Sequence, residues 1–234
     1  METFIGTSGW SYSDWRGKFY PAGLAAAEFL PYLAQHFPTV EINSSFYRLQ
    51  SPTTYRKWAA STPDGFRFAV KGPRSLRAGG DPAPFFDSLA LGNKQGPILW
   101  QLAASQKFDA QKLDAFFKSL PAGFQYALEP RTAGYDTPEA LDLLRKHEVA
   151  LVMADSGGRY PQYDQVTANT IYIRLHGSPR MYYSNYQPEV LAQWATRIRQ
   201  WRAAGHEPYV YFDNTAAGYA PANAAALRED LANE

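Results

Sequence analysis

The chain has no cysteine, no long apolar run and no excess of either charge. Because its 234 residues include 0 Cys, disulfides, thiolate catalysis and cysteine metal ligands are excluded. No apolar run approaches the roughly 20 residues that a membrane-spanning helix needs, and the first ten residues lack a signal-peptide pattern. These absences predict a cytoplasmic protein with no membrane partner.

The charges are nearly balanced, whereas aromatic residues are abundant. The 23 basic and 22 acidic side chains give a net charge of +1, which provides no general attraction to nucleic acid. A nucleic-acid partner therefore stays open only as an alternative that relies on a local basic patch. The 16 Tyr, 14 Phe and 6 Trp make up 15% of the chain, and many lie in Gly-, Ser- and Pro-rich stretches, where we expect them to line a cleft.

One stretch, residues 39–47, shows the pattern on which the predicted fold and site depend. In an extended strand, alternation places Thr39, Glu41 and Asn43 on one face and two β-branched residues on the other. A strand with this pattern fits a barrel wall, with its apolar face under helices and its polar face lining a site. Later strands repeat the pattern.

Strand patterns alternate with helix patterns about eight times, without repeats, linkers or low-complexity tracts. The expected strands cover residues 3–6, 39–43, 66–71, 98–101, 125–129, 150–155, 171–176 and 208–213. The expected helices cover residues 28–37, 53–60, 84–91, 109–120, 138–147, 188–204 and 221–231. This alternation predicts an α/β fold, a (β/α)8 TIM barrel that forms a single domain over residues 1–234. A doubly wound open sheet is the alternative, but no strand-to-helix turn carries a G-x-G-x-x-G or phosphate-loop sequence.

In barrels of this kind the active site lies at the C-terminal ends of the strands. Every expected strand from the second onward ends on at least one polar side chain, and desolvating poorly paired ions costs several kcal/mol each. A ligand site explains such a set better than packing does, although a closed ion network of four acids and three bases is an alternative. We expect these residues to converge: Glu41, Asn43, Lys71, Gln101, Glu129, Arg131, Asp155, Arg174, His176 and Asp213.

Large aromatic residues lie in the loops after the first and seventh expected strands, which stand close together in a barrel. Flat aromatic faces beside hydroxyls and cations suit a sugar ring or a base. The alternative is that these side chains only plug the mouth of the barrel. The residues are Trp10, Tyr12, Trp15, Tyr182, Tyr183 and Tyr186.

Six segments, in order along the chain, resemble the YecE-like family, known as domain of unknown function 72. The segments are GTSGWSYSDWRGKFYP, TVEINSSFYRL, FRFAVKGPR, LGNKQGP, TANTIYIRLHG and VYFDN. The resemblance covers essentially the whole chain and implies a TIM-barrel fold, but no established activity, cofactor or catalytic residue. The chain departs from the family pattern at Thr132, Tyr135 and Asp213, where His, Trp and Asn are common.

The leading hypothesis is an enzyme, or an enzyme-like pocket, for a small polar ligand with sugar-like and anionic character. Acid–base hydrolysis and isomerisation both fit, with Arg174 and Lys71 holding the anion. We expect no metal and no cofactor. The catalytic candidates are Glu41, Glu129, Asp155 and His176. The ligand-binding candidates are Trp10, Tyr12, Trp15, Asn43, Lys71, Arg131, Arg174, Tyr183, Tyr186, Asp213 and Asn214.

Two other functions stay open. A metal-dependent phosphodiesterase on nucleic acid would use acids and an imidazole from successive strands, an order that resembles endonuclease IV and xylose-isomerase-like barrels. Arg131 and Arg174 lie on the same inner rows, and such cations oppose a metal cluster. A non-catalytic binding protein is the third hypothesis. The metal ligands of the second hypothesis would be Glu129, Asp155, His176 and Asp213.

Overall fold

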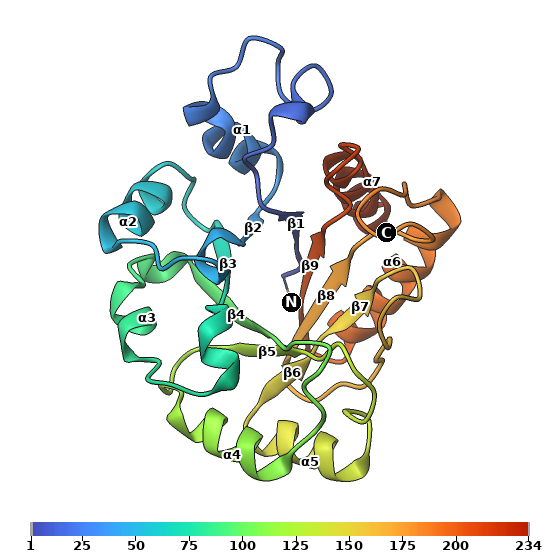
Figure 1. The fold of residues 1–234 in the computed structure, drawn as a ribbon. Helices are drawn as coiled ribbons and strands as arrows, with labels where there is room; N and C mark the ends of the chain where they lie inside the picture. Colours follow the sequence, from blue (N-terminus) through green and yellow to red (C-terminus); the bar gives the residue numbers. More distant parts are fainter. Residues whose placement is uncertain (1, 234) are drawn as a thin grey trace.

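The computed structural model of the chain describes residues 2–233. Its strands are β1 (Phe4–Ser8), β2 (Thr39–Ile42), β3 (Arg67–Lys71), β4 (Gln95–Gln101), β5 (Tyr126–Glu129), β6 (Val149–Leu151), β7 (Met153–Asp155), β8 (Thr170–Leu175) and β9 (Glu207–Phe212). Its α-helices are α1 (Phe29–His36), α2 (Pro52–Ala60), α3 (Ala83–Ser88), α4 (Ala110–Ser119), α5 (Pro138–Lys146), α6 (Pro188–Ala203) and α7 (Ala220–Ala232). Figure 1 shows the strands in the middle of the molecule and the helices around them.

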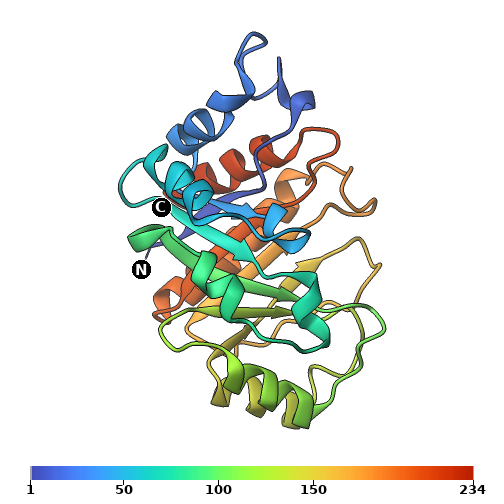
Figure 2. The ribbon, with the colours of Figure 1, turned by 60° about the vertical axis from the view of Figure 1, so that its left-hand side comes forward.

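The strands form one parallel sheet that curls into a barrel. Neighbouring strands follow the order β6–β5–β4–β3–β2–β1–β9–β8–β7. The two end strands, β6 and β7, belong to one stretch of chain, in which β6 pairs with β5 and β7 pairs with β8. This stretch nearly closes the barrel, which Figure 1 and Figure 2 show from two directions. The prediction of an α/β TIM barrel is confirmed.

The prediction of one continuous strand over residues 150–155 is wrong. Val149 lies opposite Tyr126 of β5, whereas Met153 lies opposite Ile173 of β8. The two halves of the stretch therefore pair with different neighbours, because β5 and β8 are staggered along the barrel. A hydrophobic run in the sequence carries no information on this stagger.

Three element ends also differ from the prediction. β1 runs to Ser8, two residues beyond its expected end. β2 ends at Ile42, because Asn43 has a helical backbone with φ −96° and ψ −22°. α3 ends at Ser88, because Leu89 is extended with φ −67° and ψ 119°. The longer β1 brings the Ser8 hydroxyl to the C-terminal end of the barrel.

Several helices begin at a side-chain cap. Ser51, Asp109 and Thr137 each accept a hydrogen bond from the backbone N–H three residues later, which satisfies one of the unpaired donors at a helix start. The helices then pack on the barrel through apolar faces. Among residues 2–233, no helix is both long and apolar enough to cross a membrane.

The barrel interior is an apolar layer of its own, separate from the larger core between strands and helices. Aromatic rings fill it at one level, where Phe4 stacks on Tyr209 with ring centroids 4.7 Å apart. Alanines on several strands leave room above that level for long polar side chains. The buried interior residues are Phe4, Ala69, Leu99, Ala127, Ala150, Val152, Ala154, Tyr172, Tyr209 and Tyr211.

The contact between β1 and β2 requires glycine at position 6. A Cβ atom on Gly6 would lie 2.0 Å from the carbonyl oxygen of Thr39. We predict that Gly6→Ala forces β1 and β2 apart and lowers the free energy of unfolding by about 1–3 kcal/mol, the usual cost of overpacking a core. Urea unfolding followed by circular dichroism measures the loss.

Gly23→Ala is the matched control, because a Cβ atom there meets nothing within 4 Å. We expect its stability to stay within about 0.5 kcal/mol of the parent chain. Equal stability of the two variants would show that the β1–β2 spacing is not set by Gly6.

Candidate active site

Arg174 of β8 lies at the C-terminal face of the barrel and binds side chains from four other strands or their ends. Its Nε and Nη2 donate to the two carboxylate oxygens of Glu41, at 3.0 and 2.7 Å. Its Nη1 donates to Glu129 at 2.8 Å, and Nη2 also lies 3.2 Å from Asp213. Ser8 Oγ is a further acceptor at 3.2 Å. One guanidinium therefore joins β8 to β1, β2, β5 and the end of β9.

Glu41 is fully buried, and donors surround its carboxylate. Ser8 Oγ donates to Oε1 at 2.5 Å, and the Tyr172 hydroxyl donates to Oε2 at 2.7 Å. Together with the two bonds from Arg174, these donors occupy both oxygens. Glu41 thus positions the guanidinium, and its place in the structure gives no support to the expectation that it exchanges protons with a ligand.

Glu129 is buried beside Arg174 and is bound on both oxygens. Gln101 Nε2 donates to Oε2 at 2.9 Å, while Arg131 Nε donates to Oε1 at 3.4 Å. His176 Nε2 lies 3.6 Å from Oε1. Burial alone would raise the pKa of Glu129, but Arg174 and His176 outweigh burial and hold the pKa well below its usual value.

His176 and Asp213 form a hydrogen-bonded pair at the ends of β8 and β9. Nδ1 of His176 lies 2.8 Å from Oδ2 of Asp213. Burial and Arg174 oppose a charged imidazole, but hydrogen bonds with Asp213 and Glu129 outweigh both and raise the pKa of His176. Burial likewise works against ionised Asp213, whereas Arg174 and His176 keep its pKa below the usual value. The raised pKa of His176 and the lowered pKa of Asp213 favour an imidazolium–carboxylate pair.

Lys71 ends β3 on the same face but takes no part in this network. Among the residues that the structure describes, its Nζ has no hydrogen-bond partner and no ion pair; its contact is the ring of Phe46, whose centroid is 4.3 Å away. Burial and the charge of Arg174 lower the pKa of Lys71 to about 8, although Glu129, Glu41 and Asp213 work in the opposite direction. Lys71 is 8% exposed.

The predicted role of Arg174 as the group that holds a ligand anion is not supported by its surroundings. All three guanidinium nitrogens already donate to carboxylates, and the side chain is 1% exposed. The sequence places three acids near the guanidinium, and in the structure they bind it from inside the barrel. Arg174 therefore belongs to the buried ion network.

Asp155 ends β7 on the same face but binds within its own loop. Its Oδ1 accepts the backbone N–H of Gly157 at 3.0 Å, and its Oδ2 accepts the Tyr186 hydroxyl at 3.0 Å. Tyr186 is buried, and its hydroxyl also accepts the N–H of Gly177. The hydrogen bond between Asp155 and Tyr186 joins the loops after β7 and β8. This contact does not support the expectation that Tyr186 lines a ligand cleft.

The aromatic residues of the first loop pack mainly on the chain itself. Trp15 is completely buried, which does not support the expectation that it lines a ligand cleft. It stacks on Tyr12 and donates through Nε1 to the Thr215 carbonyl. Tyr12 is partly buried, and its hydroxyl donates to the Ser8 carbonyl at 2.7 Å. Trp10 is partly buried and packs edge-on against Trp58 of α2. Tyr12 thereby reaches the site, whereas Trp15 anchors the loop.

The loops after β7 and β8 border a cavity of about 410 Å³. Tyr182 connects it with the buried network, because its ring meets the edge of His176 with centroids 5.7 Å apart. Tyr183 is 46% exposed, and the Arg180 guanidinium lies 4.1 Å from its ring centroid. The residues that line the cavity are Ser156, Gly157, Arg159, Pro179, Arg180, Met181, Tyr182 and Tyr183.

The two asparagines predicted at the site have different surroundings. Asn43 Nδ2 donates to Ser8 Oγ at 2.7 Å, and its buried Oδ1 has no hydrogen-bond partner among residues 2–233. Asn214 is fully buried and donates to the Ser184 carbonyl and to Asn223. Asn43 thus borders the network, while Asn214 ties the last loop to α7.

Sequence reasoning missed two members of the network, Ser8 and Tyr172. Ser8 was placed in the polar loop after the first strand, although continued alternation from Phe4 through Gly6 puts it on the inward face. Tyr172 lies on the inward row of β8, two residues before Arg174, and only the structure shows that its hydroxyl binds Glu41.

The arrangement gives no ready metal site. Among the residues that the structure describes, no three His, Asp or Glu side chains are placed to hold a metal ion. Arg174 lies between Glu41, Glu129 and Asp213, where a metal would need the same oxygens.

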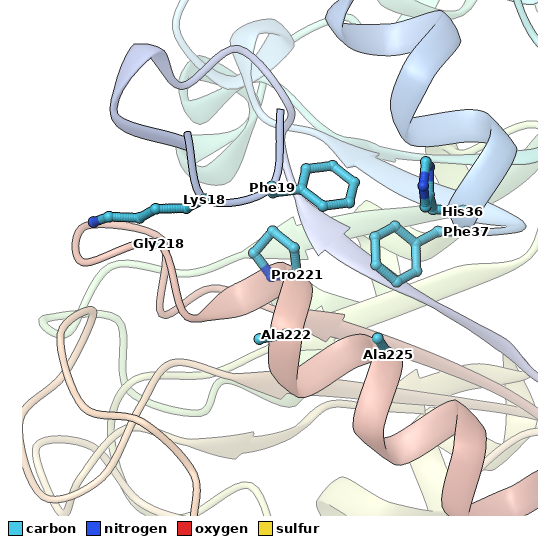
Figure 3. Close-up of a pocket in the computed structure, with 8 residues that line it drawn as sticks. All are labelled: Lys18, Phe19, His36, Phe37, Gly218, Pro221, Ala222 and Ala225. Carbon is cyan, nitrogen blue, oxygen red and sulfur yellow. The ribbon is translucent and has the colours of Figure 1, made fainter. Parts of the chain in front are cut away.

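A second cavity, of about 320 Å³, lies apart from this network. Figure 3 shows the rings of Phe19, Phe37 and Pro221 around it, between the first loop and α7. None of the residues that line it belongs to the charged face. They are Lys18, Phe19, His36, Phe37, Gly218, Pro221, Ala222 and Ala225.

Residues 4–234 match the family described as protein of unknown function DUF72, and the chain belongs to this family. The UPF0759 protein YunF of Bacillus subtilis (strain 168) is 24% identical, over 97% of this chain and 94% of the relative. The UPF0759 protein YecE of Escherichia coli (strain K12) is 27% identical, over 97% of this chain and 92% of the relative. The resemblance to the YecE-like family is confirmed.

Solved structures of DUF72 family proteins share the fold. The protein from Thermotoga maritima is 27% identical and superposes with a TM-score of 0.85, covering 99% of this chain and 100% of that one. A protein from Enterococcus faecalis is 20% identical with a TM-score of 0.84, covering 99% and 96%. These likenesses support the barrel.

Arg174→Met tests whether the guanidinium holds the buried carboxylates together. We predict that the variant lowers the free energy of unfolding by about 3–5 kcal/mol at pH 7, because it leaves buried negative charges without their shared cation. Glu129 and Asp213 have lowered pKa values in the parent chain, so their contribution is present above the unfolded-state pKa and is lost as the pH falls through the folded-state pKa. In the variant the buried acids lack their cation, so burial favours their neutral forms. The free energy of unfolding of the variant should therefore rise as the pH falls from 7 to 5.

Urea unfolding at several pH values measures both effects. The control is Arg56→Met, because Arg56 is exposed on α2 and makes one weak contact, with Thr53. A variant at position 174 that loses no more stability than this control would contradict the assignment of Arg174 to the buried network.

Proposed function

We infer that the protein is an enzyme that binds a small polar, anionic ligand at the C-terminal face of the barrel and exchanges protons with it. The observation that carries this proposal is that the charged side chains of this face fall into two sets. Glu41, Glu129 and Arg174 form a closed set, which is buried and bound on all sides. In this proposal a second set is left for the ligand: Arg131 and Asp213 keep partial exposure, and the buried Lys71 makes no ion pair with the described residues.

The open set contains two cations and one acid. Lys71 is 8% exposed, while the side chains of Arg131 and Asp213 are 17% and 13% exposed. Arg131 also lies over the Tyr160 ring, with 4.6 Å between Cζ and the ring centroid. The excess of positive charge favours an anionic ligand, and the guanidinium of Arg131 suits a phosphate or carboxylate.

The His176–Asp213 pair supplies the proton chemistry in this proposal. Oδ2 of Asp213 binds His176 and Arg174, whereas Oδ1 receives no hydrogen bond from residues 2–233. An imidazole with a raised pKa beside a carboxylate with a free oxygen can give and take protons near neutral pH. Hydrolysis and isomerisation of a sugar-like ligand both need such a pair.

Hydroxyl and aromatic groups beside the pair favour a sugar-like body for the ligand. Tyr182 contacts His176 edge-on and has a positive φ of 70°, an uncommon conformation for a tyrosine. Strained residues of this kind cluster at ligand sites. Arg159 and Arg180 line the neighbouring cavity and extend the positive character of the mouth.

Isothermal calorimetry with matched anionic and neutral ligands tests this function. We predict that glycerol 3-phosphate, glucose 6-phosphate or glucuronate binds, whereas glycerol and glucose do not. Arg131→Met should weaken binding at least tenfold, or about 1.4 kcal/mol, because the variant removes a cation that the ligand contacts.

Arg145→Met is the control, because Arg145 lies on α5 and pairs with Asp142 at the surface. Equal binding of neutral and anionic ligands would contradict the proposal. Stoichiometric zinc or manganese in the purified protein would instead favour the metal-dependent hydrolase, and binding without turnover of any bound ligand would favour a non-catalytic binding protein.

A further inference from the structure

Two buried lysines of this barrel have opposite surroundings. Lys94 precedes β4, and its Nζ donates to the Ala59 carbonyl at 2.7 Å, to the Thr62 carbonyl at 2.6 Å and to Thr62 Oγ1 at 3.2 Å. Those acceptors use the three protons of an ammonium group. Lys71 is equally buried, but within the described part of the chain its Nζ meets only the ring of Phe46.

A buried ammonium without acceptors is costly, so this environment lowers the pKa of Lys71, and the cation that predominates at pH 7 is in equilibrium with a minor neutral amine that can react. The nearby carboxylates do not relieve the cost, because Glu41 and Glu129 bind Arg174 and Asp213 binds both Arg174 and His176. Arg174 adds a like charge. Desolvation and a neighbouring cation are the two conditions that make a lysine nucleophilic, and the pKa of Lys71, about 8, agrees with this geometry.

The backbone that carries the amine is also held in place. Ser45 Oγ donates to the Lys71 carbonyl at 2.7 Å, and Ser45 belongs to the short 3₁₀ helix Ser44–Phe46 that carries the ring beneath Nζ. On the other side, a Cβ atom at Gly72 would lie 2.3 Å from the Trp100 ring, so glycine lets that ring close the end of β3. A nucleophile on a rigid strand end has little positional freedom to lose when it reacts.

We propose that Lys71 is a catalytic residue that forms a Schiff base with the carbonyl carbon of a small anionic aldehyde or ketone. This substrate class rests on the proposed function, in which Arg131 holds the anionic group. The chemistry explains why a lysine is buried without acceptors at the mouth of an otherwise well-paired site.

The step balances with the groups on this face. The lone pair of Nζ forms the C–N bond, the carbonyl π pair moves to oxygen, and one N–H proton transfers to that oxygen to give a carbinolamine. A second proton, from the His176–Asp213 pair, lets the oxygen leave as water while the nitrogen lone pair closes the C=N bond. The product is a protonated imine that keeps one N–H proton.

Reductive trapping tests the inference on the unmodified protein. The protein is incubated at pH 7.5 with dihydroxyacetone phosphate, glyceraldehyde 3-phosphate or pyruvate and sodium cyanoborohydride, and modified lysines are identified by peptide mass mapping. We expect one adduct on Lys71, formed at least tenfold faster than on the exposed Lys112, and none on the buried Lys94. The Lys71→Met variant should lose the fast adduct.

A rate at Lys71 no higher than at Lys112 with all three probes would overturn the inference. Calorimetry with glycerol 3-phosphate, which has no carbonyl, separates this failure from that of the proposed function. Binding of glycerol 3-phosphate without an adduct would leave the anion site intact and remove the Schiff base. If neutral dihydroxyacetone is also trapped fast and no anion binds, Lys71 is a reactive lysine, but the anionic substrate class is overturned.

Discussion

The guanidinium of Arg174 is the constraint on which the rest of this barrel depends. It is buried at the C-terminal face and shared by Glu41, Glu129 and Asp213, which come from β2, β5 and the end of β9. A buried ion must be paired, since several kcal/mol are lost when its partner is absent. Each of these strands must therefore reach the same height in the barrel, and Ser8 and Tyr172 complete the network by donating to Glu41.

This pairing also decides which groups are open to a ligand. Because the acids bind Arg174 and His176, Lys71 has no ion pair with any of the residues that the structure describes, although it lies on the same face. Arg131 keeps partial exposure at the end of β5, and Oδ1 of Asp213 receives no hydrogen bond from residues 2–233. The structural ion network and the proposed ligand site thus share one face, and the network sets the charge environment of the proposed site. Of the two interpretations of the polar strand ends, the structure shows the ion network, and the ligand site stays a proposal.

Alternation along the strands predicts the barrel and most of the polar face, because inward and outward positions follow directly from a period of two. The partners of each side chain are not contained in that pattern. The sequence does not show whether the three acids near Arg174 bind it or leave it free for an anion; the structure shows that they bind it.

The burial of Trp15 also depends on the folded structure. Trp15 lies in a polar loop, but its contacts with Tyr12 and Thr215, which form only when the first loop is folded, accompany its complete burial. The division of β6 from β7 depends on barrel stagger, which is a property of the whole sheet.

The most direct measurement is an NMR pH titration of the Lys71 side chain in protein carrying ¹³C-labelled lysine, with the signal assigned through its absence in Lys71→Met. If the carboxylates are committed to Arg174 and His176, Lys71 stays without a partner and titrates near pH 8. A transition at about pH 10 or above, the range of an ordinary lysine, would show that an acid of this face pairs with Lys71 and would contradict the division into a closed and an open set.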